Sequence, residues 1–180
     1  MFKKFTNDDI GNQTQLKTSV QRNIKAKIVE QYPLLEPFIE ELIPKKSPCY
    51  LVKCLDRVSL LSVSGQPLFF QHFDGPFYPN LKLLHKYPDI LPKIQVDTGA
   101  IKFVLKGADI MCPGMTSKGG RLPDVALEAD RVVAIMAEGK EHAVAIGLTK
   151  MSTLDIASIN KGIGVENIHF LNDGLYKTLP

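Results

Sequence analysis

The sequence predicts an α+β fold in which an amino-terminal α/β meander domain is followed by a small β-barrel domain. Apolar residues near the amino terminus recur every four positions, which is the period of a helix. Short apolar runs separated by turn residues then fill both halves of the chain, as is typical of antiparallel strands. The segment 89–92 ends in proline and resembles a connection, so we expect domains at 1–92 and 93–180. We also expect a fragment ending near Pro92 to fold alone.

In the first domain, residues 2–11 are interpreted as a loosely ordered arm or a short strand. Leu16, Val20, Ile24 and Ile28 follow and predict a helix of about four turns. Prolines flank a second short helix, because proline suits a first helical turn and disrupts a helix interior. The remaining predicted elements are that helix at 34–43, meander strands at 50–55, 58–63 and 67–73, and a helix at 81–87.

The second domain is expected to open with a strand at 94–96. Two further runs, 101–105 and 108–112, are each long enough for one strand, and glycine or proline marks the breaks around them. Glycine lets the backbone reach positive φ and leaves the surface open to a ligand. The remaining predicted elements are a hairpin of strands at 131–137 and 141–148, a helix that begins at the capping-box-like segment 152–155 and ends at 159, and a last strand at 165–170.

Composition excludes several classes of protein. Hydrophobic residues make up 44% and charged residues 23% of the chain, as in an ordinary globular domain. No apolar run approaches the ~20 residues needed to cross a bilayer, and the polar segment 6–15 leaves no room for a signal-peptide core. We therefore expect no membrane partner and a cytosolic or nuclear protein.

Cations gather around the two runs between residues 101 and 112. Lys102, Lys106, Lys118 and Arg121 lie on or beside them. Such an arrangement suits a sugar-phosphate backbone, although an ordinary hairpin with solvated lysines fits the residue types equally well. The net charge of +3 is uneven: residues 1–95 carry 13 basic and 9 acidic side chains, and residues 96–180 carry 9 and 10. Any nucleic-acid contact must therefore be local, or be shared with the first half.

Segments along most of the chain resemble known proteins. Residues 99–114 resemble the opening of a PUA domain, an RNA-binding module first seen in pseudouridine synthases and archaeosine transglycosylases. Further segments resemble the malignant T-cell amplified sequence protein family, in its order and with its spacing. These are Met1-Phe-Lys-Lys-Phe5, Gly75-Pro-Phe-Tyr-Pro79, Leu83-Leu-His-Lys-Tyr-Pro88, Val133-Ala-Ile-Met-Ala-Glu-Gly-Lys140, Asn160-Lys-Gly-Ile-Gly164 and Glu166-Asn-Ile-His169.

The resemblance implies a non-enzymatic, cytoplasmic translation factor that pairs with density-regulated protein. Such a factor binds small ribosomal subunit RNA and tRNA. It promotes reinitiation, post-termination recycling and GTPase-independent recruitment of initiator tRNA. Two other classes stay open: a PUA accessory protein that delivers RNA to a separate modification enzyme, and an adaptor that binds only proteins.

The same resemblance directs the choice of site residues. We expect Lys102, Lys106, Lys118, Arg121 and Lys140 to contact RNA, and Gly99, Gly107 and Gly114 to form the glycine positions of the PUA motif. If 101–105 is a strand, the aromatic ring within it lies on the face opposite the lysines, in the core or against a partner. The predicted partner-binding residues are Phe103, Phe77 and Tyr78. The family pattern is broken at Lys106, Lys118 and 122–131, which leaves the exact RNA footprint open.

No motif in the sequence predicts catalysis. The segment 119–124 superficially resembles a catalytic loop of pseudouridine synthases, but Pro123 interrupts the pattern. The four histidines are isolated, and the three cysteines follow no metal-binding spacing. We therefore predict no catalytic residue, metal or cofactor, and buried reduced thiols at Cys49, Cys54 and Cys112.

Overall fold

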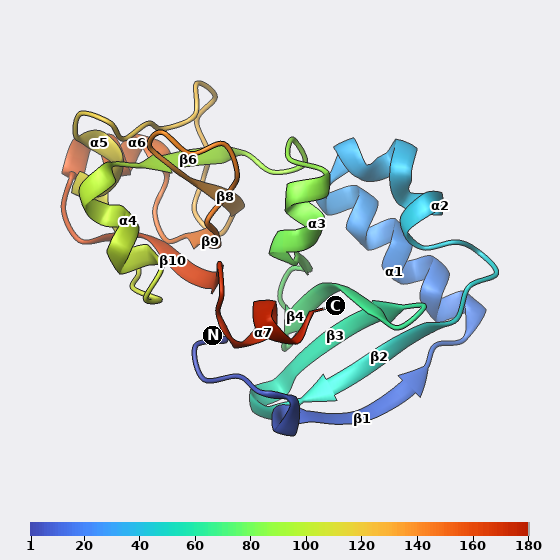
Figure 1. The fold of residues 1–180 in the computed structure, drawn as a ribbon. Helices are drawn as coiled ribbons and strands as arrows, with labels where there is room; N and C mark the ends of the chain where they lie inside the picture. The colour runs from blue at the N-terminus through green and yellow to red at the C-terminus, as the bar shows by residue number, and fades with distance from the viewer. Residues whose placement is uncertain (180) are drawn as a thin grey trace.

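The computed structural model describes residues 1–179 and contains two five-stranded sheets, one in each half of the chain. Their strand orders are β1-β2-β3-β4-β5 and β6-β8-β9-β10-β7. Figure 1 shows the two halves side by side, with α3 and β6 leading from one to the other. The predicted α+β class is confirmed.

The first sheet is an antiparallel meander. Its strands β2 (Cys49–Cys54), β3 (Val58–Val63) and β4 (Gln66–His72) match the three predicted runs to within one residue at each end. The strands β1 (Ile10–Gln15) and β5 (Tyr78–Pro79) extend the two edges. The short helices η1 (Asn7–Asp9) and η3 (Leu55–Arg57) precede β1 and β3.

Helices of the first domain pack through their apolar side chains on this sheet. The predicted first helix is α1 (Thr18–Gln31), in which Ile28 is fully buried. The predicted second helix is divided into a 3-10 helix, η2 (Pro33–Phe38), and a short α2 (Ile39–Leu42). Pro37 explains the division, because its ring lacks an N–H and clashes with the preceding turn of an α-helix. The helix α3 (Leu81–Lys86) completes the domain.

The second sheet combines parallel and antiparallel pairing. Strand β6 (Lys93–Val96) pairs in parallel with β8 (Val132–Ala137), and the other pairs are antiparallel. The predicted hairpin is β8 with β9 (Ala145–Thr149), although β9 begins four residues after the predicted start at 141. Strand β10 (Ile163–Phe170) is the predicted last strand. The helix α6 (Thr153–Ile159) begins at Ser152, whose side chain accepts a hydrogen bond from the Asp155 N–H.

The prediction of a strand at 101–105 is wrong. Residues Thr98–Val104 form the helix α4, and Asp97 caps it by accepting a hydrogen bond from the Ala100 N–H at 2.9 Å. The strand predicted at 108–112 is present only in part: β7 covers Ile110–Met111, and α5 (Cys112–Thr116) begins at the last residue of the run. An apolar run of five residues does not distinguish a strand from a short helix, so the capping residue decides.

Both chain termini pack against the domain junction. Phe2 is fully buried, with its ring 4.8 Å from that of Phe70 and 5.8 Å from that of His169. Its carbonyl accepts a hydrogen bond from the Gly174 N–H, at the start of the terminal helix α7 (Gly174–Thr178). In Figure 1 the N-terminus lies near α7. The prediction of a loose arm is therefore wrong for Phe2.

Core residues from both domains meet at this junction. The larger cluster of buried residues contains the helices and sheet of the first domain together with Ala134, Ala143, Ile146, Ile168, Leu175 and Leu179. A second cluster is built only from residues between Ile94 and Phe170. His169 and Asp173 form a fully buried pair beside the first cluster, with Nδ1 and Oδ2 2.7 Å apart. The two halves thus share a continuous core.

Candidate RNA-binding site

The amino end of α4 is occupied by carboxylates of the chain itself. Glu138 Oε2 accepts hydrogen bonds from the Thr98 N–H at 2.9 Å and from the Thr98 hydroxyl at 2.8 Å. Asp97, the cap residue, also accepts one from the Ser117 hydroxyl. Negative charge is favourable at a helix N-terminus. These contacts join α4, the loop after α5 and the end of β8 into one surface.

Lys102 and Phe103 lie on the exposed side of α4. The Lys102 Nζ is 5.2 Å from the centre of the Phe103 ring, and Phe103 is 55% exposed. Val104 faces inward and is buried, while Lys106 is exposed just after the helix. The interpretation of Phe103 as a core residue is therefore wrong, and its expected role as a partner-facing anchor stays a prediction.

The three predicted motif glycines have different environments. Gly107 has φ +93°, and a Cβ there would lie 3.0 Å from the Phe170 ring. Gly114 packs against Ala100, with 3.4 Å from its ideal Cβ position to the alanine Cβ, so α4 and α5 approach closely. Gly99 is exposed within the first turn of α4. Gly107 and Gly114 thus serve backbone conformation and packing, and only Gly99 lies open on the surface.

Arg121 and Lys140 line the same cavity, of about 510 Å³, together with Lys93. Leu91, Leu122 and Met136 contribute apolar lining. The cavity therefore combines three cations with apolar side chains, which suits a phosphate and a base of one nucleotide. Sequence reasoning missed Lys93, because one lysine at the start of a short strand carries no recognisable signal.

Hydrogen bonds hold the loop that carries Arg121 against β6. The backbones of Gln95 and Arg121 exchange two hydrogen bonds of 2.9 Å each, and the Gln95 side-chain amide donates to the Gly119 carbonyl at 2.7 Å. Gly119 has φ +95°, and a Cβ there would lie 2.2 Å from the Glu138 carboxylate. Lys118 is exposed next to this tight contact. The loop is thus closely packed against its neighbours.

Two carboxylates partly balance the cations of this cavity. The Lys93 Nζ lies 3.0 Å from Asp89 Oδ1, and an Arg121 nitrogen lies 3.8 Å from Asp124 Oδ2. All four side chains are exposed, and such surface pairs contribute about 0–1 kcal/mol each. A phosphate can therefore displace them at small cost.

The five predicted cations do not all meet in one place. Arg121 and Lys140 share the cavity, Lys118 lies on the adjoining loop, and Lys102 and Lys106 lie on and after α4. The hydrogen bonds of Thr98 to Glu138 connect these regions.

Phe77 and Tyr78, which are predicted to bind a partner, are buried. Their side chains are 5% and 4% exposed. The Phe77 carbonyl accepts a hydrogen bond from the Tyr32 hydroxyl, and the Tyr78 ring stacks on Phe70 with the centroids 5.0 Å apart. Burial raises the pKa of Tyr78 to about 12 and also raises that of Tyr32. Both residues belong to the core cluster of the first domain: Tyr78 lies in β5, paired with β4, and Phe77 directly precedes it.

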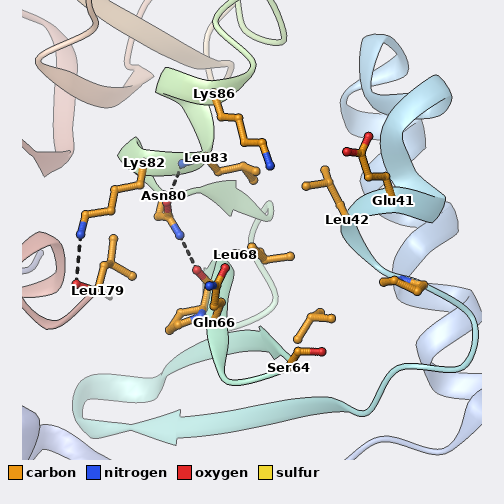
Figure 2. A pocket seen from close by; sticks show the side chains of 13 residues that line it. Glu41, Leu42, Ser64, Gln66, Leu68, Asn80, Lys82, Leu83, Lys86 and Leu179 are labelled. Carbon is orange, nitrogen blue, oxygen red and sulfur yellow. Dashed lines mark hydrogen bonds between the residues drawn. The ribbon is translucent and has the colours of Figure 1, made fainter.

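A different cavity, of about 430 Å³, lies in the first domain (Figure 2). Its polar side chains hold the fold together: Asn80 accepts from the Leu83 N–H at 2.8 Å and donates to the Pro67 carbonyl. Lys82 donates to the Leu179 carbonyl at 3.0 Å, which fixes the C-terminal segment on α3. The cavity therefore lies where the C-terminal segment packs against the first domain.

Cys49 and Cys112 are buried, Cys54 is half-buried, and burial raises the pKa of each thiol. The three form no disulfide with one another. Within residues 1–179 no three metal-binding side chains come together. No helix in the same range is long and apolar enough to span a membrane.

Comparison with known proteins defines the class of this chain. Residues 4–88 match the model of the Pre-PUA-like domain and residues 92–171 that of the PUA domain. Hypothetical protein PH0734.1 from Pyrococcus horikoshii OT3 shares the fold, with a TM-score of 0.74, 20% identity and coverage of 94% of this chain and 100% of that chain. A PUA-domain structure from Aeropyrum pernix K1 gives a TM-score of 0.69 at 22% identity, covering 92% and 89%. The chain is a two-domain pre-PUA and PUA protein.

Relatives similar in sequence identify the family. Malignant T-cell-amplified sequence 2 of Mus musculus is 56% identical over 177 residues, covering 98% of this chain and 97% of the relative. Translation machinery-associated protein 20 of Schizosaccharomyces pombe is 54% identical over 180 residues, covering 99% of each. The chain belongs to the malignant T-cell-amplified sequence family.

Proposed function

We propose that this protein is a translation-associated RNA-binding protein that acts without catalysis. More specifically, it binds small ribosomal subunit RNA and tRNA in the cytoplasm as a heterodimer with density-regulated protein. Its family membership supports this proposal, since relatives include proteins named for association with the translation machinery. The PUA domain supplies the RNA-binding fold.

The cavity shared by Lys93, Arg121 and Lys140 carries the proposal. Its cations position a phosphate backbone, and its apolar lining accepts a base or ribose from a single-stranded end. Lys118, Lys102 and Lys106 extend the RNA-binding surface toward α4. The mechanism is positioning by phosphate contacts and shape, with no covalent step.

In the proposed role, this cavity holds the acceptor end of a tRNA on the small ribosomal subunit. A factor of this kind promotes reinitiation, removes deacylated tRNA during post-termination recycling and recruits initiator tRNA without a GTPase. Phe103, exposed on α4 beside Lys102, is the proposed contact for density-regulated protein. Exposed aromatic residues often contribute much of the binding energy at an interface.

A double charge reversal tests the cavity. Arg121→Glu with Lys140→Glu should weaken tRNA binding, measured by fluorescence anisotropy, and lower the salt slope by about 1 for each phosphate that the variant no longer neutralises. The matched control is Lys45→Glu with Lys46→Glu, an equal charge change at positions of the first domain outside the cavity. Equally weakened binding in both variants would show that only net charge matters and would remove the cavity from the site.

Co-sedimentation with free small ribosomal subunits tests the biological assignment. The wild-type protein should sediment with the subunits, and the double variant should not. Association with an RNA-modification enzyme in place of the subunits would establish the accessory role.

A further inference from the structure

The first domain presents an aromatic ring and a guanidinium together on its surface. Phe73 follows β4 and is 52% exposed, and the Arg57 Cζ lies 4.4 Å from the centre of its ring. The His72 ring meets Phe73 edge to face at 4.8 Å. We refer to Arg57 and Phe73 as the Arg57–Phe73 stack.

The backbone holds this stack in place. Asp56, Arg57 and Phe73 have φ of 57°, 60° and 54°, in the left-handed region that bulky residues rarely adopt. The Phe73 N–H donates to the Arg57 carbonyl at 3.1 Å, which ties the turn before β3 to the end of β4. An exposed phenylalanine contributes little to a core, so its strained placement against an arginine needs another explanation.

A cavity of about 330 Å³ adjoins the stack and is lined by Lys4, Asp9, Leu55, Asp56 and His72, among others. Two carboxylates in its lining offset the lysine charge. Attraction of phosphate alone is therefore weak here, and planar stacking is the interaction that these residues offer. Nucleobases stack on aromatic rings and on the guanidinium plane of arginine.

We propose that the Arg57–Phe73 stack binds one unstacked base of single-stranded RNA. This inference rests on the proposed function for the class of ligand, but it assigns a contact on the pre-PUA domain, separate from the PUA cavity. Because the guanidinium already covers one face of the Phe73 ring, the base stacks on an outer face of this pair. The guanidinium N–H groups at the edge remain able to donate to the base or to a phosphate. RNA would then contact both domains at once.

The test uses the full-length chain and a fluorescein-labelled oligomer of about 12 uridines, long enough to fill a single-strand site of ordinary size, with affinity measured by anisotropy at two salt concentrations. Phe73→Ala should weaken binding by about fivefold or more, as removal of one stacked base does. Its salt slope should stay that of the wild type, because no charge is removed. Arg57→Lys should also weaken binding, because it keeps the charge and removes the planar group.

The matched control is Phe38→Ala, which removes a half-exposed aromatic residue from the helical side of the same domain. It should leave the affinity unchanged, and circular dichroism should confirm that every variant is folded. Wild-type affinity in Phe73→Ala, or equally weakened binding in Phe38→Ala, would overturn the stacking proposal.

The outcome is separable from that of the proposed function. Weakened binding in the Arg121 and Lys140 double variant, with wild-type binding in Phe73→Ala, overturns only the stack. Weakened binding in Phe73→Ala, with wild-type binding in the double variant, supports the stack and shows that the PUA cavity does not bind this RNA. A wild-type chain that binds neither the oligomer nor tRNA overturns both.

Discussion

The two domains differ in where their core residues come from. The PUA domain contains a cluster built only from its own residues, between Ile94 and Phe170. The first domain instead packs on side chains from the second half, including Ile168, Leu175 and Leu179. We infer from this difference that the PUA domain can fold by itself, whereas the first domain is stabilised by its contacts with the PUA domain and with α7.

The largest effect is expected from dividing the chain. A fragment of residues 1–92 lacks Ile146, Ile168, Leu175 and Leu179, so it should show no cooperative thermal transition by circular dichroism. This prediction is the opposite of the expectation from sequence, that a fragment ending near Pro92 folds alone, and the experiment decides between the two. A fragment of residues 93–171, the control, should unfold cooperatively because it retains the PUA cluster. Cooperative unfolding of the 1–92 fragment at any temperature would contradict the asymmetry between the two domains.

Removal of the Phe2 ring should have the next largest effect. The ring is fully buried between Phe70 and His169, at the junction of both domains. Phe2→Ala should therefore lower the free energy of unfolding by about 3–5 kcal/mol, measured by urea denaturation. Met1→Ala, at a neighbouring position that is 47% exposed, should change it by less than about 1 kcal/mol.

The substitution Gly174→Ala should force the N-terminal segment that contains Phe2 and Phe5 away from α7. The added Cβ would lie 2.0 Å from the Phe5 carbonyl oxygen, so backbone must move and stability should fall by about 1–3 kcal/mol. Gly99→Ala is the control, in α4 of the PUA domain. It adds a Cβ with ordinary contacts in a helix and should stabilise by up to about 1 kcal/mol. Equal melting temperatures for the two variants would show that Gly174 is not closely packed against the Phe5 carbonyl.

The smallest effect concerns alkaline pH. Burial raises the pKa of Tyr78 to about 12 from an ordinary value near 10, so the unfolded chain releases this proton first. Its contribution to stability is full below pH 10 and is lost as the pH rises toward 12. Tyr78→Phe should therefore show a shallower fall in stability than wild type between about pH 10 and 11, by denaturant titration. Identical slopes would exclude the contribution of this hydroxyl.

The sequence predicts elements with strong periodicity well and the glycine-rich segment poorly. The meander strands and the hairpin of β8 and β9 agree with prediction because their apolar runs are bounded by turn residues. The helix α4 does not, although Asp97, three residues before Ala100, is a readable capping signal. Its apolar pattern fits a strand and a short helix equally well, so only the cap distinguishes them.

The sequence likewise predicts only some residues of the candidate site. Arg121 and Lys140 are predicted from residue type and resemblance, and they line one cavity. Lys93 escapes prediction because it meets Arg121 and Lys140 only in the folded chain, where β6 pairs with β8 and Gln95 of β6 is hydrogen-bonded to Arg121. The prediction for Phe77 and Tyr78 is wrong because residue type alone does not tell which aromatic side chains a sheet will cover.

The buried position of Phe2 has a practical consequence for handling the protein. Any affinity tag or fluorophore joined to the amino end must leave through Met1, beside the junction, and can disturb the relative placement of the domains. Leu154, 69% exposed on α6 and outside the lining of the proposed RNA-binding cavity, is a better place for a label. Proteins labelled at the two places should be compared before RNA affinities are interpreted.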